Sequence, residues 1–414
     1  MTQPYFEHID SIHPEITSIL PLSFELLPEF DTDECRLLAE LRREPRLLRL
    51  VAESDGSELA VQRRLRAEFP DNLVRTALLI VDLRRKAQVK FQRAGEMWFD
   101  RQGLEQSTGE LVARHKAQRF SGEIWDLCCG IGGDALALAT RGSVTAVDRN
   151  PAACLRAQWN ATVYGLNIAV RCGDVTQIEA RSGLVHLDPD RRAGGRGKQV
   201  RLEDSVPGLE FMEDLTRQWS GGAIKLSPAS NFGGKFPEAE VELISVQGEC
   251  KEATIWFGSL AKPDSFRATV LPAGATLSGH PMDALAPLGP PARFVYDPDP
   301  AVVRAGLIDL AACQLGLTRL DSSEEYLTSE TLVASPFVRA FEILAELGSN
   351  DRELRAYFRA GNFGEAEIKC RHIPIDAAGV RRKLQLEGSE TATVIFARVN
   401  GRTRVLVCRR CPTP

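Results

Sequence analysis

The sequence lacks the features that mark several special classes of protein. No apolar run is long enough to cross a bilayer, and the first fifteen residues have neither the basic nor the apolar part of a secretion signal. Aromatic residues make up only 7% of the chain, and the net charge of -5 argues against a uniformly basic nucleic-acid-binding protein. We therefore expect a cytoplasmic protein without a membrane partner, in which any surface for nucleic acid is local.

Cysteine and histidine form no recognisable framework. The ten cysteines include the adjacent Cys128 and Cys129, and a single CxxC pair at Cys408 and Cys411 that has no second pair beside it. A tetrahedral zinc site needs four ligands. We therefore expect reduced thiols, no metal ion, and ordinary roles for the six dispersed histidines.

The length of 414 residues predicts more than one domain, because single cores stop growing at roughly 250 to 300 residues. Helical spacing predicts a helical N-terminal domain over 1–120, whose part 81–120 carries nine basic and five acidic residues. It is followed by a second domain over 121–272, a Pro- and Gly-rich linker over 273–300 and a C-terminal domain over 301–414. In this last part we expect helices at 301–317 and 335–347, then a basic α+β unit.

The segment from residue 122 predicts an α/β fold. Short apolar runs at 124–127, 143–148, 168–175, 183–188 and 221–226 alternate with helical segments, which is typical of a parallel sheet. The runs VELISVQ and KEATIWFGSL, joined by GEC, then predict an antiparallel hairpin that closes the sheet.

Three acids follow three successive strands of this predicted sheet. Asp126, Asp148 and Asp174 stand at the strand ends, and the turn CGIGG after the first strand provides Gly130 and Gly132. Ligands of open α/β sheets bind beyond the carboxyl ends of the strands, and glycines let the backbone approach them closely. A dinucleotide is the alternative, but the spacing is not GxGxxG and Asp126 would repel a pyrophosphate. A cationic cofactor therefore fits these residues better than a dinucleotide does.

This pattern resembles that of class I S-adenosylmethionine-dependent methyltransferases, which have a Rossmann-like sheet. The resemblance implies S-adenosyl-L-methionine as the cofactor, with Asp148 accepting from the ribose hydroxyls and Asp174 from the adenine amino group. The residues assigned to the cofactor are Asp126, Cys128, Gly130, Gly132, Gly133, Asp148, Arg149, Asp174 and Val175. Cys128 stands where the family usually has glycine, so we expect an ordinary negative φ at that position.

The fourth strand leads into DPDRRAGGRGK, which is the expected reaction site. Asp188 and Pro189 resemble the start of the Asp/Asn-Pro-Pro-aromatic motif of amino methyltransferases, in which the acid or amide aligns the target nitrogen. Asp190 and Arg191 depart from the motif, so the target atom stays open. We take Asp188, Pro189, Asp190 and Lys225 as catalytic candidates, with Lys225 pairing with Asp188 or Asp190. Candidates for substrate binding are Arg191, Arg192, Arg196, Lys198 and Asn231; a merely solvated basic loop is the alternative.

The full set of motifs is similar to that of a bacterial family of class I methyltransferases with a C-terminal THUMP-like domain. It comprises LEQSTGELVARH, DLCCGIGGD, AVDRNP, LDPDRR, AIKLSP, YDPDP, EIKCRHIPI and RRKLQL. THUMP domains serve RNA-modifying enzymes, so the resemblance implies N-methylation of a base in tRNA or rRNA. Two alternatives stay open: a methyltransferase of a small molecule or protein, and a non-catalytic RNA-binding protein that retains the fold. The oligomeric state is not predicted.

Overall fold

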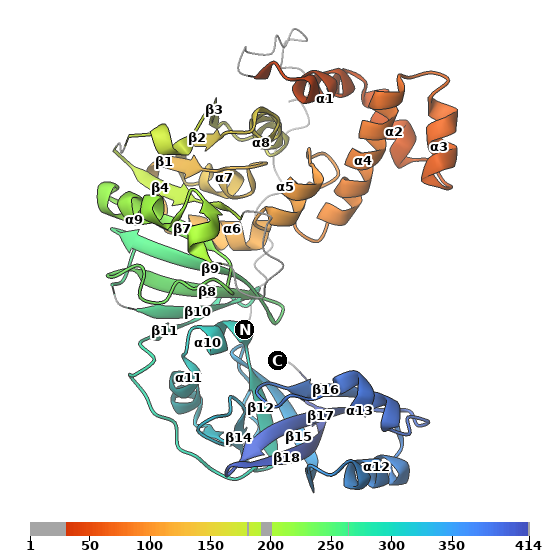
Figure 1. The fold of residues 1–414 in the computed structure, drawn as a ribbon, viewed down its shortest axis with the longest axis vertical. Coiled ribbons are helices and arrows are strands. Elements are labelled where there is room, and N and C mark those ends of the chain that lie inside the picture. The colour runs from red at the N-terminus through yellow and green to blue at the C-terminus, as the bar shows by residue number, and fades with distance from the viewer. Residues whose placement is uncertain (1–29, 180–181, 192–200, 264, 413–414) are drawn as a thin grey trace, which may run out of the picture. The chain divides into compact units, whose positions relative to one another are not determined.

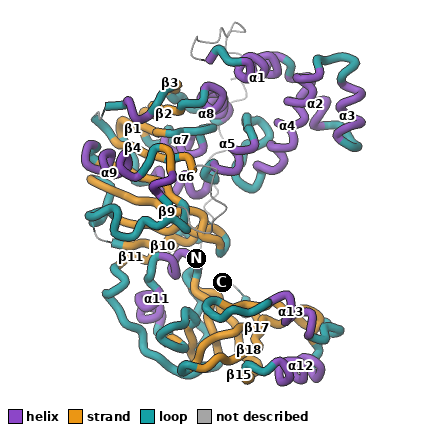
Figure 2. The backbone as a smooth tube through the Cα atoms, in the orientation of Figure 1, coloured by secondary structure: helices purple, strands orange, loops and turns teal. Residues whose placement is uncertain are grey.

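The computed structural model describes residues 30–179, 182–191, 201–263 and 265–412. The chain divides into two compact units, one ending at Leu78 and the other beginning at Leu79. Figure 1 shows the elements of both units and Figure 2 their secondary structure. None of the described helices is long and apolar enough to cross a membrane.

The described part of the first unit, residues 30–78, is built from helices. Side-chain oxygens of Thr32 and Ser57 accept from backbone N–H groups and start two of its helices. Leucines on one face of these helices are buried. The helices are α1 (Asp33–Arg43), α2 (Pro45–Ala52), α3 (Glu58–Leu65) and the start of α4 (Asp71–Ala87), which continues into the second unit.

The second unit contains a nine-stranded sheet, and its order is β11-β10-β8-β9-β7-β4-β1-β2-β3. Its parallel strands are β1 (Gly122–Leu127), β2 (Gly142–Asp148), β3 (Ala169–Cys172), β4 (Leu184–Leu187) and β7 (Gly221–Leu226). The hairpin of β8 (Glu240–Val246) and β9 (Glu249–Gly258) follows, with β9 antiparallel to β7. The α/β fold and the five parallel strands predicted from the sequence are confirmed.

The prediction that this hairpin closes the sheet is wrong. Two further strands, β10 (Phe266–Leu271) and β11 (Ala275–Gly279), extend the sheet beyond β8, and β10 pairs with β8 in parallel. Ala268 of β10 and Leu277 of β11 are buried in the core. The hairpin edge is therefore covered by paired backbone, which removes an exposed row of hydrogen-bonding groups.

Helices and short elements connect the strands of this sheet. They are α5 (Arg101–Gln106), α6 (Glu110–Ala117), α7 (Gly133–Leu138), α8 (Pro151–Val163), η2 (Val175–Gln177), β5 (Asp190–Arg191), η3 (Leu202–Asp204), β6 (Ser205–Val206) and α9 (Leu209–Gln218). Asn150 caps α8 and Pro151 occupies its first position. The buried Asn160 on α8 donates to the carbonyls of Trp98 and Ile131 and accepts from Trp98 N. It thereby holds the glycine-containing turn against the segment before β1.

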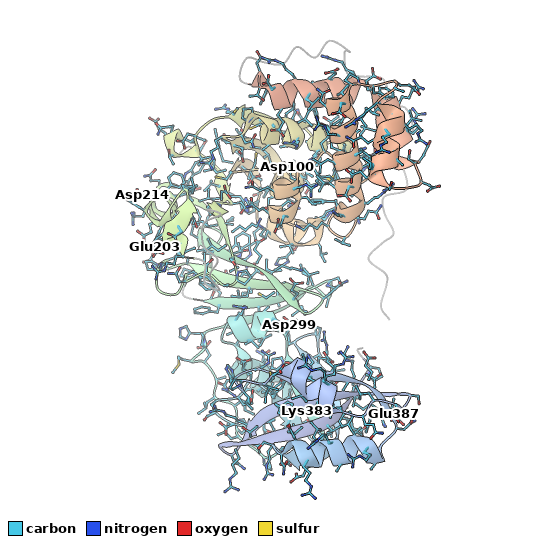
Figure 3. All side chains as sticks on the ribbon, turned by 45° about the vertical axis from the view of Figure 1, so that its right-hand side comes forward. Asp100, Glu203, Asp214, Asp299, Lys383 and Glu387 are labelled. Carbon is cyan, nitrogen blue, oxygen red and sulfur yellow. The ribbon has the colours of Figure 1, made fainter. Side chains whose placement is uncertain are left out.

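The C-terminal part contains a seven-stranded sheet of order β13-β14-β12-β15-β18-β17-β16. Its strands are β12 (Phe294–Pro298), β13 (Thr318–Arg319), β14 (Leu327–Ser329), β15 (Val338–Gly348), β16 (Phe363–Cys370), β17 (Glu390–Val399) and β18 (Arg402–Arg410). Its helices are α10 (Pro300–Arg304), α11 (Ile308–Leu315), α12 (Asp351–Ala360) and α13 (Ala377–Lys383). Lys383, labelled in Figure 3, pairs with Asp351 and so joins α13 to α12.

The helix predicted over 335–347 is wrong, because this segment forms β15. Both edges of β15 are hydrogen-bonded, to β12 on one side and β18 on the other. Pairing along two edges outweighs the helix propensity of its Ala, Glu and Leu residues. Two strands, β11 and β12, also lie inside the segment 273–300 that the sequence predicts as a linker.

Candidate active site

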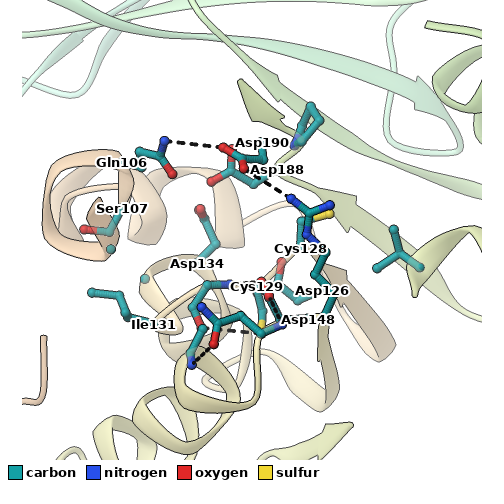
Figure 4. A pocket seen from close by; sticks show the side chains of 18 of the residues that line it. Gln106, Ser107, Asp126, Cys128, Cys129, Ile131, Asp134, Asp148, Asp188 and Asp190 are labelled. Atoms are coloured by element: carbon teal, nitrogen blue, oxygen red, sulfur yellow. Dashed lines mark hydrogen bonds and ion pairs between the residues drawn. The ribbon is translucent and has the colours of Figure 1, made fainter. Parts of the chain in front are cut away.

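A cavity of about 530 Å³ opens at the carboxyl ends of β1, β2, β3 and β4 (Figure 4). Seven aspartates and a single arginine are among the residues that line it. Sequence-predicted site residues in its wall are Asp126, Cys128, Gly130, Gly133, Asp148, Arg149, Asp174, Val175, Asp188, Pro189 and Asp190. The cavity therefore brings the predicted strand-end acids together, and its acidic wall suits a cationic ligand.

The turn after β1 reverses the chain through left-handed backbone. Cys128 has φ 60°, Gly130 φ 53° and Gly132 φ 89°, so the ordinary negative φ expected at Cys128 is wrong. The chain has to turn at once, because Cys129 N donates to Val147 O of the neighbouring strand, 3.0 Å away. A Cβ atom at Gly130 would meet no heavy atom within 4 Å, so the space beside this residue is part of the cavity.

The other two glycines serve the packing of the turn. A Cβ atom at Gly132, which does not line the cavity, would lie 3.2 Å from Ala157 Cα on α8. One at Gly133 would lie 3.0 Å from the carbonyl oxygen of Thr108. Glycine at these two positions therefore lets α8 and the segment before β1 approach closely.

Asp148 is held by backbone groups at both of its oxygens. Oδ2 accepts from Gly130 N at 2.8 Å and Oδ1 from Asn150 N at 2.9 Å. Burial raises the pKa of Asp148, while these two hydrogen bonds act in the opposite direction. The Nη2 atom of the neighbouring Arg149 lies 3.6 Å from Asp190 Oδ2. A carboxylate oriented in this way can accept from two adjacent hydroxyl groups.

Asp174 begins the short helix η2 and is exposed. Its Oδ1 accepts from both Thr176 N and Thr176 Oγ1, and these bonds lower the pKa of Asp174. Its Oδ2 takes part in neither bond. Val175 is buried beside it in the cavity wall. The pair thus presents an acceptor next to an apolar surface.

Asp126 is only 1% exposed. His186 Nδ1 lies 2.7 Å from its Oδ1, whereas Oδ2 has no hydrogen-bond partner among the described residues. Burial raises the pKa of Asp126, and the hydrogen bond from His186 opposes that shift. Burial also opposes a charged His186 ring, but the carboxylates of Asp134 and Asp126 raise the pKa of His186 above its ordinary value.

Lys116 connects His186 to two further acids. Its Nζ lies 2.8 Å from Asp134 Oδ1, 2.6 Å from Glu252 Oε1 and 3.2 Å from His186 Nε2, and all four side chains are buried. Burial opposes ionisation of Asp134, but the ammonium of Lys116 prevails and lowers its pKa. Asp134 therefore forms a buried ion pair with Lys116.

Asp188 and Lys225 form the pair that the sequence allowed. Lys225 Nζ lies 2.6 Å from Asp188 Oδ2 and donates to Gln106 O at 2.9 Å. Lys225 itself does not line the cavity. Asp190 Oδ1 accepts from the amide of Gln106 at 3.4 Å. Lys225 is thus placed to orient Asp188 from behind.

The predicted substrate residues lie elsewhere or are not described. Asn231 does not line the cavity, and its Oδ1 accepts from Leu202 N at 3.1 Å. The backbone of Arg191 pairs with Ser205 between β5 and β6. Arg192, Arg196 and Lys198 lie outside the described residues.

Sequence reasoning missed the part of the wall that precedes β1. It consists of Asp100, Gln102, Gly103, Gln106, Ser107 and Thr108. Lys90 holds this segment, because its Nζ donates to the carbonyls of Leu104, Glu105 and Ser107. Burial, followed by the charges of Lys225 and Lys251, lowers the pKa of Lys90 to about 8. The cap spacing of Asp100 and Gly103 was the signal available for the start of α5.

The fold and cavity define a class of protein. An open, largely parallel sheet with the antiparallel β9 inserted between β7 and β8, acids at its strand ends and a glycine-containing turn is the architecture of a Rossmann-like enzyme that binds a nucleoside-bearing cofactor. The free Oδ2 of buried Asp126 and the open space at Gly130 fit a cofactor with a cationic end. Among the described residues, no cluster of three side chains could hold a metal ion.

Comparison with known proteins gives the family. The family model described as "Methyltransferase domain" matches residues 124–187, and "THUMP domain-like" matches 338–410. An uncharacterised S-adenosylmethionine-dependent methyltransferase, found in two strains of Mycobacterium tuberculosis, is 34% identical over 351 residues, 81% of this chain and 95% of that protein. The crystal structure of a candidate methyltransferase from Porphyromonas gingivalis W83 has a TM-score of 0.74 and 20% identity, covering 92% of this chain and 100% of that one.

This chain belongs to the S-adenosylmethionine-dependent methyltransferases, and its C-terminal part contains a THUMP-like domain. It is an enzyme of that class and S-adenosylmethionine is its cofactor.

Proposed function

We propose that this enzyme methylates a nitrogen atom of a base in tRNA or rRNA and that it acts in the cytoplasm. The observation that carries the proposal is Asp188, which follows β4 in the cavity wall with Oδ2 held by Lys225. The THUMP domain-like match supports an RNA substrate. The ten cysteines are all free, which supports a reducing compartment.

For the cofactor, we assign each described group to the part that its chemistry can recognise. Asp148 accepts from the ribose hydroxyls, Asp174 from the adenine amino group, and Val175 packs against the adenine ring. Asp126 Oδ2 accepts from the ammonium of the methionine part, and the backbone at Gly130 lies along that part. S-Adenosylmethionine supplies a methyl group on a positively charged sulfur, which is already activated for transfer.

On the substrate side, Asp188 accepts a hydrogen bond from the target amine and directs its lone pair into the cavity. Lys225 keeps the carboxylate in one orientation, because its ammonium is bound between Asp188 and the carbonyl of Gln106. Alignment of this kind is the main contribution an enzyme can make to an activated transfer. Lys225 does not act as the base, since it serves as the donor in both of these contacts.

We assign methyl transfer to a domain over 121–272 and RNA binding to residues 301–414, joined by 273–300 and preceded by a helical domain over 1–120. Exposed arginines on two helices of the C-terminal part support this assignment. They are Arg352, Arg355 and Arg359 on α12, and Arg381 and Arg382 on α13. Contacts between such side chains and phosphates would make RNA binding fall steeply as salt rises.

The test uses total RNA from the source organism lacking the gene and S-adenosylmethionine with a labelled methyl group. We expect label in tRNA or rRNA, recovered as an N-methylated nucleoside by mass spectrometry. Asp188→Ala should abolish labelling, whereas the exposed control Asp214→Ala should not change it. Label confined to small molecules or to protein would replace RNA as the substrate. Tight cofactor binding without label in any fraction would favour the non-catalytic RNA-binding protein.

A further inference from the structure

We propose that His186 is a positioning residue that holds Asp126 so that its free oxygen receives the ammonium of the cofactor. The inference rests on the cofactor placement proposed above and deepens it. It assigns a role to a histidine that the sequence treats as ordinary. It also explains why a buried histidine stands on the strand beside the glycine-containing turn.

The two residues are direct neighbours across the sheet. Asp126 of β1 and His186 of β4 are register partners in a parallel pair of strands, so their side chains lie on the same face. His186 Nδ1 lies 2.7 Å from Asp126 Oδ1, and each side chain is 1% exposed. Because one oxygen of Asp126 is bound in this way, rotation of the carboxylate is blocked and Oδ2 stays in a constant position.

The other side of the imidazole ring is held as well. Lys116 Nζ lies 3.2 Å from His186 Nε2, and an ammonium can only donate. A neutral ring therefore accepts at Nε2 and carries its hydrogen on Nδ1, where Asp126 accepts it. A protonated ring donates at Nδ1 too, so the bond to Asp126 is kept in both charge states. The ring of Phe120 packs edge-on against His186, with centroids 6.4 Å apart.

The charges explain why this carboxylate selects a cation. The positive charge of Lys116 is already shared by two buried carboxylates, Asp134 and Glu252. Asp126 contacts no Lys or Arg among the described residues, and its buried Oδ2 has no hydrogen-bond partner there, which is costly. An ammonium at Oδ2 supplies the missing partner. A ligand without that ammonium therefore gains no affinity from Asp126.

Two ligands that differ in the relevant part test the inference without measuring catalysis. S-Adenosylhomocysteine carries the ammonium, whereas 5′-methylthioadenosine shares the adenosine and sulfur but lacks the amino-acid end. Calorimetry on the full chain gives the dissociation constant of each. Their ratio in one preparation is the measured quantity, so a partly unfolded sample affects both ligands alike.

The variants form a matched pair of amides. The side-chain nitrogen of His186→Asn can occupy the place of Nδ1 and donate to Asp126, whereas the amide of His186→Gln reaches the place of Nε2 beside Lys116. We expect His186→Gln to lower the preference for S-adenosylhomocysteine by about tenfold, the loss of one hydrogen bond to a charged group, and His186→Asn to restore most of it. Equal ratios in the two variants would overturn the inference.

Two additional measurements separate the possible failures. Asp126→Asn should lower the same ratio; if it does not, the proposed ammonium site is wrong, whatever His186 does. If Asp126→Asn lowers the ratio and both histidine variants leave it unchanged, only the inference on His186 fails. Nitrogen NMR of the wild-type ring needs no variant: a hydrogen on Nδ1 supports the inference, and a neutral ring with its hydrogen on Nε2 overturns it.

Discussion

Lys225 Nζ contacts both Asp188 Oδ2, at 2.6 Å, and the carbonyl oxygen of Gln106, at 2.9 Å. The first partner follows β4 and the second is the last residue of α5, so a single ammonium joins two walls of the cavity. Lys90 occupies the carbonyls of Leu104, Glu105 and Ser107. Two lysines therefore satisfy four successive carbonyls at the end of α5, a place where a helix otherwise leaves such groups unpaired.

Replacement of Lys225 should affect transfer more than cofactor binding. In Lys225→Met, Asp188 loses its orienting contact, and we expect the methyl-transfer rate to fall about 10- to 100-fold, as for loss of a hydrogen bond to a charged group. The affinity for S-adenosylhomocysteine should change little, because Lys225 does not line the cavity. Single-turnover rates and calorimetry measure the two effects. Lys251→Met, at an exposed ion pair, is the control; an unchanged rate in Lys225→Met would contradict the orienting role.

Replacement of Asp148 should weaken both ligands equally. Asp148→Ala removes the proposed acceptor for the ribose hydroxyls, which S-adenosylhomocysteine and 5′-methylthioadenosine share. We expect each dissociation constant to rise by about one to two orders of magnitude. Asp214→Ala, at an exposed ion pair with Arg217, should leave both constants unchanged. Unaltered affinities in Asp148→Ala would refute the ribose contact.

The affinity for S-adenosylhomocysteine should fall as the pH is lowered. Burial raises the pKa of Asp126, and an ammonium is bound by the ionised carboxylate. Binding therefore releases the proton of Asp126, and affinity is lost as the pH falls through its raised pKa. The ratio to 5′-methylthioadenosine, followed by calorimetry, isolates this group from Asp148. A ratio independent of pH, or a pH dependence that survives in Asp126→Asn, would count against the assignment.

Lys90 should make the free energy of unfolding rise with pH in the alkaline range. The folded chain releases the Lys90 proton near pH 8, whereas an ordinary lysine holds it to 10.5, so the unfolded state binds more protons between these values. Urea unfolding across this range measures the slope. The slope should be less positive in Lys90→Met than in wild type, whereas Lys262→Met, in which a different lysine is lost, should leave it unchanged. An equal slope in wild type and Lys90→Met would contradict the shifted pKa.

Asn160 should contribute strongly to stability. Asn160→Ala removes three buried hydrogen bonds, to Trp98 N, Trp98 O and Ile131 O. At about 1 kcal/mol for each bond, we expect the free energy of unfolding to fall by about 3 kcal/mol. Urea denaturation measures it, and Asn362→Ala, at an exposed bond to Ser389, is the control. A loss no larger than that of the control would show that the turn does not depend on this side chain.

Much of the fold could be predicted from the sequence because the patterns that indicate its strands are local. The five parallel strands and the hairpin each show in a few consecutive residues, and the acids that follow the strands meet at one edge in any such sheet. The predictions from the sequence failed where contacts with residues distant along the chain determine the local backbone structure. The segment of β15 has helix-forming residues but pairs along both edges, and Cys128 takes a left-handed φ because β2 is bonded directly behind it.

The order of strands and acids along the chain was sufficient to predict the α/β class and the edge of the sheet where the cavity lies, and the resemblance of the motifs to a known family implied the cofactor. Those features follow from patterns within a few residues. Only the tertiary structure decided that Asp126 meets His186, that Lys116 meets Glu252, and that the segment 100–108 completes the wall. Such contacts join residues far apart in the sequence, and strand register and burial, which no local pattern encodes, bring them together.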